Sequence, residues 1–288
     1  MFSIPPASGA TPPAFGGTSR GGEATSTTGN NANGGSPMVL TGESSTQVID
    51  SMHSDYIFKV AFDTYGRRMA TCSADRFVRL WDLQDTGEWA LVGQWQAHRG
   101  AVTSLAFAHP EFGHLLATCG SDHDAIIWEE RTSHGAGPTN SLSSRWTACA
   151  SLTDARRAVT CLEFAPRHWG LKLAVGSADG SVRIYEAVDI MNLAQWPLAA
   201  TLPSQNHISS LSWCTGRFEP LTLVAGGSHL VIYRYIESAR AWKSLMELPT
   251  SSDVLDVAWA PNVGRRFHYI AATSDDGQLR VYKLSRKI

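Results

Sequence analysis

One strand pattern recurs five times along this chain. In each segment an alternating strand ends in an aromatic residue, and a second strand of small apolar residues follows after a loop. A turn, usually with Asp, then leads to a third strand that closes on Trp or Tyr. The closing aromatic residues are Trp81, Trp128, Tyr185, Tyr233 and Tyr282, at intervals of 47, 57, 48 and 49 residues. Short strands at such a period predict an all-β propeller with five recognisable blades.

Further apolar stretches follow four of the segments and complete the predicted blades. They lie at 88–95, 145–152, 196–202 and 241–248. Four strands per unit is the composition of a propeller blade. The predicted blades therefore cover residues 53–95, 98–152, 157–202, 206–248 and 252–284, within a propeller domain of residues 51–288. The longest interval is explained by residues 131–144, which are rich in Ser, Gly and Thr and are predicted to form a surface loop.

Residues 1–50 have a different composition. Gly, Pro, Ser and Thr fill 28 of these 50 positions, and only four residues are charged. Such a segment buries too little apolar surface to offset the entropy lost on ordering, so we predict a disordered tail. Thr46 to Asp50 is a candidate strand that leads into His53.

Composition and motifs argue against several function classes. A formal net charge of −2 gives no electrostatic reason to expect nucleic-acid binding. The sequence holds no apolar run of about 18 residues and no secretory signal, so we expect no membrane span and five reduced cysteines. It also lacks Cys-x-x-Cys pairs, a Walker loop and a nucleophile elbow. We therefore expect no cofactor, no metal site and no enzymatic activity.

Two segments match the WD repeat in detail, and the fold prediction is accordingly a WD40-type β-propeller. In WD-repeat proteins an Asp of a tight turn bonds a His of the incoming loop, and a Ser or Thr links that His to a Trp indole. The resemblance implies this network in blades one and two, while the fourth blade has Gly227 in place of the Asp. The predicted structural residues are His53, Asp75, Trp81, His98, Asp122, Trp128, Asp179 and Asp276.

The polar residues admit rival interpretations. His, Asp and Ser together suggest a hydrolase, but the set recurs blade after blade, which active sites rarely do. Gly66–Arg68 and Gly264–Arg266 are short basic clusters. We interpret both as solvated turns, and the alternative is contact with an acidic surface of a partner.

Several segments carry a closer resemblance than the WD pattern. They are YGRRMATCSADRFVRLWDL (65–83), AHPEFGHLLATCGSDHDAIIWEE (108–130) and FAPRHWGLKLAVGSADGSVRIYEA (164–187). Over residues 53–284 the chain resembles the small open-propeller coat nucleoporins, a group with one relative shared with the vesicle coat and one nuclear-pore homologue. Gly170–Ala174, Leu211–Cys214 and Trp259–Arg265 favour the nuclear-pore homologue.

The resemblance implies a non-catalytic scaffold. Members of this group are six-bladed open propellers to which an α-helical scaffold nucleoporin donates a blade in trans. They belong to the Y-shaped coat of the nuclear pore complex, at the nuclear envelope of the nucleus, and support nucleocytoplasmic transport. A second implied role lies in a coat-like complex at the vacuolar (lysosomal) membrane that regulates target-of-rapamycin signalling.

The sequence departs from the group in one respect. The sixth repeat is not present, and six residues follow Tyr282. We expect an open, incomplete propeller whose fifth blade lacks an outer strand, so that Arg280 to Leu284 presents an unpaired edge. The alternative functions are a vesicle-coat propeller subunit at endoplasmic reticulum exit sites and a generic WD-repeat adaptor.

Overall fold

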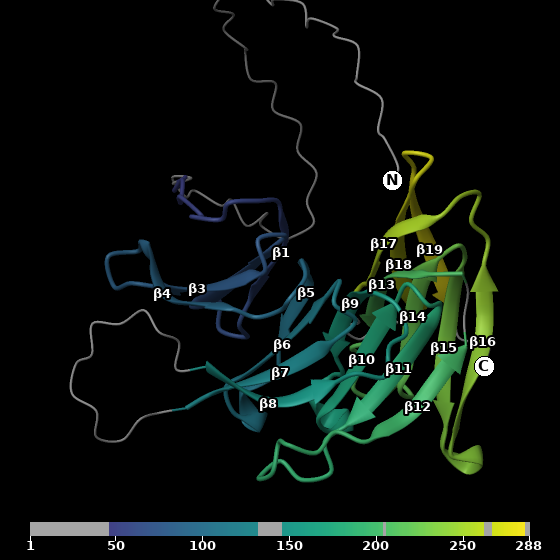
Figure 1. Cartoon of the computed structure of the whole chain (residues 1–288). Helices are drawn as coiled ribbons and strands as arrows, with labels where there is room; N and C mark the ends of the chain where they lie inside the picture. Colours follow the sequence, from purple (N-terminus) through teal and green to yellow (C-terminus); the bar gives the residue numbers. More distant parts are fainter. Residues whose placement is uncertain (1–45, 132–145, 204–205, 262–266, 286–288) are drawn as a thin grey trace, which may run out of the picture. The chain divides into compact units, whose positions relative to one another are not determined.

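The strands of this chain form five antiparallel sheets that follow one another in sequence (Figure 1). The computed structural model describes residues 46–131, 146–203, 206–261 and 267–285. Four sheets have four strands each, and in the described residues the fifth has three. The prediction of an all-β, open WD-type propeller with five blades is confirmed.

Each sheet is a simple meander from its first strand to its last. Blade one holds β1 (Ile57–Phe62), β2 (Arg68–Ser73), β3 (Phe77–Leu83) and β4 (Trp89–Gln96). Blade two holds β5 (Val102–Phe107), β6 (Leu115–Gly120), β7 (Ala125–Glu130) and β8 (Trp146–Leu152), and blade three holds β9 (Val159–Phe164), β10 (Lys172–Ser177), β11 (Ser181–Glu186) and β12 (Leu198–Pro203). Blade four holds β13 (Ile208–Trp213), β14 (Thr222–Gly227), β15 (Leu230–Ile236) and β16 (Ala241–Leu248), and blade five holds β17 (Val254–Trp259), β18 (Phe267–Ser274) and β19 (Leu279–Ser285). Three short 3-10 helices, η1 (Pro110–Phe112), η2 (Arg167–Trp169) and η3 (Glu237–Ala239), lie in connections.

The prediction of a strand at Thr46 to Asp50 is wrong. These residues form no strand, and Val48 is 91% exposed. A side-chain hydrogen bond ties them to blade one, in which the Trp89 backbone N–H donates to Gln47 Oε1 at 3.3 Å. A single bond of this kind does not create the ladder that a strand needs. The predictions for the tail at 1–45 and for most of the loop at 131–144 lie outside the described residues.

The first strands of the blades lie side by side, β1 against β5, β5 against β9, β9 against β13 and β13 against β17. A separate hydrophobic cluster fills each interval between neighbouring sheets. Hydroxyl groups reinforce the three later intervals: Thr103 Oγ1 donates to the Val159 carbonyl at 2.7 Å, and Thr160 and Ser209 repeat this bond one and two blades on. The sheets are therefore joined consecutively, each to its neighbours.

The two end sheets leave apolar faces uncovered. In blade one, Val60 is 47% and Phe62 54% exposed, while Leu105, at the register position of Val60 in blade two, is fully buried. In blade five, Leu279 and Val281 are exposed, although they occupy the positions of the buried Val78 and Leu80 of blade one. Within the described residues no strand pairs with the outer edge of β19.

Candidate functional site

The predicted network of blade two is a chain of three short hydrogen bonds. His98 Nδ1 lies 2.9 Å from Asp122 Oδ1, and His98 Nε2 lies 2.9 Å from Thr118 Oγ1. The Trp128 indole N–H donates to the same hydroxyl at 2.8 Å. Each buried polar group thus satisfies another, as its desolvation requires.

Burial sets the titration of this network. It lowers the pKa of His98, against the opposing attraction of Asp122, so the imidazole is held neutral. For Asp122 burial acts to raise the pKa, but the His98 interaction and the backbone N–H of Arg99 outweigh it and lower the pKa. An imidazole that stays neutral, with both ring nitrogens hydrogen-bonded to protein groups, has a structural role.

Blade one repeats this geometry and adds an arginine. His53 Nδ1 lies 2.8 Å from Asp75 Oδ2, His53 Nε2 lies 2.9 Å from Thr71 Oγ1, and the Trp81 indole donates to Thr71 at 3.3 Å. The Arg79 guanidinium donates to Asp75 at 3.2 Å and also contacts His53. Burial acts to raise the pKa of Asp75, but hydrogen bonds from Phe77 N–H, His53 and Arg79 lower it to about 2.

Asp179 and Asp276 have an arginine partner in place of a histidine. Arg183 Nη2 donates to Asp179 at 2.8 Å in blade three, and Arg280 Nη2 donates to Asp276 at 2.5 Å in blade five. Ala155 stands where blade two has His98, so the guanidinium takes over the charge-assisted bond to the turn carboxylate. The structure therefore joins His53 to Asp75 and His98 to Asp122, but it links neither Asp179 nor Asp276 to a histidine.

The arginines were missed in the sequence although a signal for them exists. Asp-x-x-x-Arg runs from the turn into the third strand of blades one, three and five, as DRFVR, DGSVR and DGQLR. The tyrosines that replace Trp also find partners: the Tyr185 hydroxyl donates to Asp154 at 2.9 Å and that of Tyr282 to the Pro249 carbonyl at 2.6 Å. All these groups hold turns and strand ends in place.

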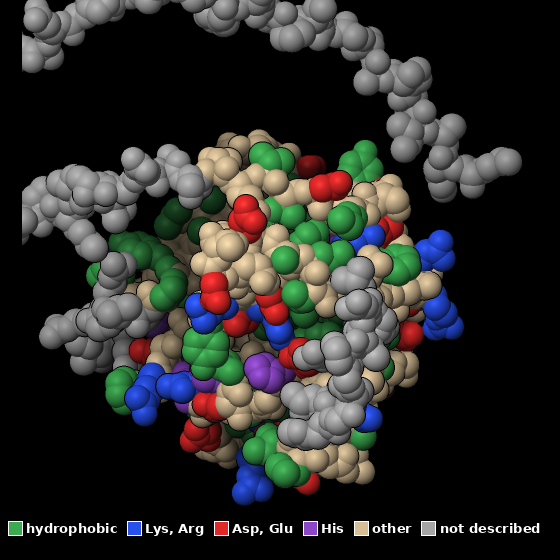
Figure 2. Space-filling model, turned by 90° about the vertical axis from the view of Figure 1, so that its left-hand side faces the viewer, with side chains coloured by type: hydrophobic (Ala, Val, Ile, Leu, Met, Phe, Trp, Pro, Cys, Tyr) green, Lys and Arg blue, Asp and Glu red, His purple; other side chains and the backbone are tan. Residues whose placement is uncertain are grey.

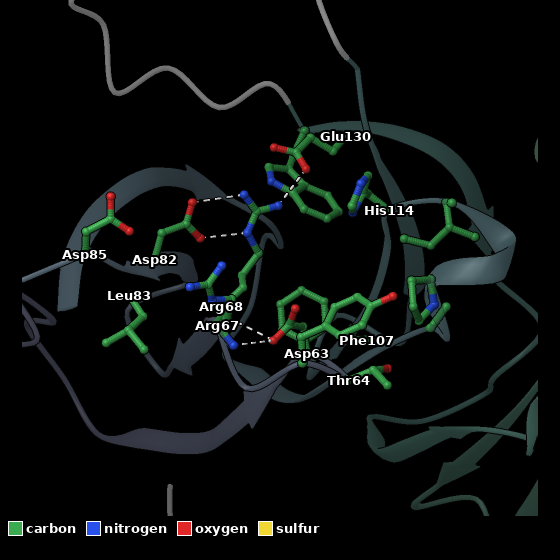
Figure 3. A pocket seen from close by; sticks show the side chains of 16 residues that line it. Asp63, Thr64, Arg67, Arg68, Asp82, Leu83, Asp85, Phe107, His114 and Glu130 are labelled. Atoms are coloured by element: carbon green, nitrogen blue, oxygen red, sulfur yellow. Dashed lines mark hydrogen bonds and ion pairs between the residues drawn. The ribbon is translucent and has the colours of Figure 1, made fainter. Parts of the chain in front are cut away.

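The interpretation of Gly66–Arg68 as a solvated turn is wrong for Arg68. Its guanidinium makes a bidentate pair with Asp82, at 2.7 and 3.0 Å, and reaches Glu130 of blade two at 2.6 Å (Figure 3). The pair with Asp82, opposed by burial and helped by Glu130, raises the pKa of Arg68. Arg68 therefore clamps two blades beside a cavity of about 400 Å³. Gly264–Arg266 lies outside the described residues.

The surface that remains unexplained by the turn networks is the uncovered face of β1. Ile57 is 42% exposed, and with Val60 and Phe62 it forms an apolar row along the first strand; these three residues are called the blade-one flank below. Their equivalents in blade two, Val102, Leu105 and Phe107, pack on blade one. Figure 2 views the molecule from the side on which β3 and β4 lie in Figure 1, and hydrophobic side chains are intermixed with charged and other polar groups on that face. Apolar rows of this kind mark contact surfaces.

Other kinds of site find little support in the described part of the chain. Within residues 46–131, 146–203, 206–261 and 267–285, no three His, Cys, Asp or Glu side chains gather as metal ligands would. Among the same residues, no helix has the length and apolarity to cross a membrane. The blade-one flank is therefore kept as a candidate contact surface, and the turn networks as structural elements.

Comparison with known proteins agrees with this geometry. The family model "WD domain, G-beta repeat" matches residues 44–82 and 89–129, in blades one and two. Nucleoporin SEH1 of Bos taurus is 40% identical over 246 residues, covering 82% of this chain and 68% of the relative. The chain belongs to the SEH1 nucleoporin family.

Other members of the family are similarly close. Nucleoporin SEH1 of Osmerus mordax is 41% identical over 243 residues, and that of Homo sapiens is 39% identical over 246 residues. The chain spans just under two thirds of the Osmerus mordax protein, 66% of its length.

Proposed function

We propose that this chain is a non-catalytic scaffold subunit of the nuclear pore complex that holds an α-helical scaffold nucleoporin on its blade-one flank. The partner supplies a sheet that packs on β1 as a blade in trans. Family membership supports the nuclear-pore role, since the relatives are named nucleoporins. The single observation that carries the binding site is the exposure of Ile57 and Val60 at positions where blade two has the fully buried Val102 and Leu105.

The register of the flank explains why a sheet would fit it. Leu105 is the equivalent of Val60 in blade two, and it packs on Val78 and Leu80 of the preceding sheet. Val60 therefore faces the side on which a preceding sheet would lie, and a sheet there removes its apolar surface from water. Burying Ile57, Val60 and Phe62 would contribute roughly 1.5–3 kcal/mol for each side chain that becomes fully buried.

The two uncovered faces differ in character. The blade-one flank includes an aromatic side chain, Phe62, and aromatic residues are enriched at the core of protein interfaces. The face of blade five is aliphatic, with Leu279 and Val281 in the register that packs on a following blade elsewhere in the molecule. Both faces suit a further sheet, and the flank, with the larger aromatic side chain, is the one that we assign to the partner.

Affinity purification of the tagged chain from its own cells tests this proposal. We expect mass spectrometry to find nuclear-pore coat subunits, including an α-helical scaffold nucleoporin, with the wild-type chain. Ile57→Asp with Val60→Asp should lose them because two charges cannot enter an apolar contact. The control is Met191→Asp, an exposed methionine on blade three.

Other results would overturn the proposal. Recovery of vesicle-coat cage subunits would instead support a role at endoplasmic reticulum exit sites, and recovery of ligase subunits would support a generic WD-repeat adaptor. Equal recovery of nucleoporins by wild type and the double variant would move the binding site away from the blade-one flank.

The proposed location follows from the proposed partners. Other subunits of the Y-shaped coat would place the chain at the nuclear envelope, where it would support nucleocytoplasmic transport. The resemblance to coat nucleoporins also motivates a second place, a coat-like complex at the vacuolar membrane that regulates target-of-rapamycin signalling. The same purification from vacuolar membranes tests it, and absence of coat-like subunits there would remove that role.

A further inference from the structure

A long aromatic groove crosses the outer side of blades three and four. It consists of two cavities of about 820 and 620 Å³ that share Trp169, at the end of η2, and Tyr235, in β15. Trp242 of β16 lines the first cavity and stands edge-to-face against Tyr235, with ring centroids 5.7 Å apart. We call this surface the lateral groove.

The floor of the lateral groove is rigid. Trp242 also packs on Trp213 of β13, with ring centroids 5.9 Å apart, and Trp213 is buried. The Trp213 indole in turn donates to the Glu163 carbonyl of blade three at 3.0 Å. Aromatic residues held in this way offer a large apolar area that loses little conformational entropy when a ligand binds.

The lining of the groove carries a small excess of positive charge, with four basic residues (Lys172, Arg217, Arg234 and Arg240) and three acidic ones (Glu186, Glu219 and Glu237). Glu186 pairs with Lys172, and Glu219 lies 3.6 Å from His268. Among the described residues, Arg217 and Arg240 form no salt bridge. The positive field is also felt at His168, whose pKa is lowered by burial and then by Arg217 and Arg167.

One further side chain points to a docking surface. Phe218, beside Arg217 in the loop between β13 and β14, is 92% exposed and lines the second cavity. A large aromatic residue on a loop tip gains nothing in the free protein, since it packs on little there. A bound segment that fills the groove would cover it.

We propose that the lateral groove binds an acidic peptide segment of a partner protein, with its carboxylates at Arg217 and Arg240 and an aromatic or aliphatic anchor on Trp169, Tyr235 and Trp242. Charge complementarity selects this ligand. A neutral proline-rich peptide would use the aromatic floor but leave both guanidinium groups without a partner. The lateral groove lies on blades three and four and does not include the blade-one flank, so the two surfaces can be tested separately.

Fluorescence anisotropy with the full chain tests the proposal. The ligand is a short fluorescein-labelled peptide in which Glu alternates with Trp and Leu, and the comparison peptide carries Lys in place of every Glu. We expect the acidic peptide to bind, with affinity that falls as salt rises, and the lysine peptide not to bind. Arg217→Glu with Arg240→Glu should weaken binding roughly tenfold, which corresponds to about 1.4 kcal/mol.

Matched variants separate the groove from general charge. Arg67→Glu changes an exposed arginine on blade one and should leave the affinity unchanged. Phe218→Ser, at an exposed position, should weaken binding several-fold, and the melting temperature of each variant shows that it is folded. Three results would overturn the proposal: equal binding of the two peptides, equal loss in Arg67→Glu, or binding to vesicles of phosphatidylserine and phosphatidylcholine without binding of the acidic peptide.

Discussion

The third strands of blade three and blade five carry the same kind of residue at the same position, but its side chain is buried in blade three and exposed in blade five. Ile184 is 1% exposed, and Val281, its equivalent five residues after the turn aspartate, is 62% exposed. Both lie in regular antiparallel ladders. The apolar pattern along a strand thus specifies the strand, while burial depends on whether another sheet lies against it.

The largest expected effect on stability comes from placing a charged side chain at each of these two positions. Ile184→Asp should destabilise the chain by more than about 4 kcal/mol because the carboxylate enters a closed core without a partner. Val281→Asp should change stability by less than about 0.5 kcal/mol because water already reaches that position. Urea midpoints of the two variants measure the difference, and equal losses would show that blade five is covered in solution.

A second prediction compares the turn networks. His98→Ala should cost roughly 1–3 kcal/mol because it leaves Asp122 and Thr118 without their buried partner. Asp276→Ala should cost less because its arginine partner in the end blade can turn to water. Denaturation midpoints decide this prediction, and a His98→Ala variant as stable as wild type would show that the network carries no stability.

A third prediction concerns the hydroxyl bonds between blades. Thr103→Val should cost about 1 kcal/mol because the bond to the Val159 carbonyl is lost while the shape is kept. Leu255 occupies the same position in blade five and is exposed, so Leu255→Thr should be neutral. Thermal melting of the two variants is the measurement, and a neutral Thr103→Val would assign the cohesion of the blades to apolar packing alone.

The smallest effect appears only as pH falls. His53 and His98 have lowered pKa values in the folded chain, so below about pH 6.5 the unfolded chain takes up protons that the folded chain does not. Stability therefore decreases from about pH 7 to pH 5. Asp75, with its pKa lowered to about 2, contributes stability that is lost at lower pH, as the solution passes below about pH 4.

The histidine contribution can be isolated by substitution. A variant with His53→Gln and His98→Gln should show a flatter dependence of melting temperature on pH between about 7 and 5, although it is less stable throughout. Blade three, with Ala155 at this position, already lacks such a group. A slope as steep as in wild type would assign the acid sensitivity to other residues.

Local repetition explains how much of this structure was predictable. The aromatic ends at Phe62 and Trp81, and their equivalents, predict strand positions because each depends on residues close in sequence. Arg68 could not be placed in this way, since its bond to Glu130 depends on how two sheets face each other. The lateral groove could not be predicted either, because Trp169 and Trp242 line one cavity only after blades three and four are packed.

Because the sheets are joined consecutively, the blades at the two ends of the row should be less stable than those in the middle. A closed ring distributes strain around its circumference, whereas a row of sheets bound only to neighbours behaves as a one-dimensional stack with two ends. Among the residues that the structure describes, the main contacts of blades one and five are each with a single neighbouring blade, so thermal fluctuation should loosen these two first and leave blade three intact longest. A further sheet packed on blade one or blade five would turn that end blade into an interior one. Unfolding of the neighbouring blades should then become more cooperative as well.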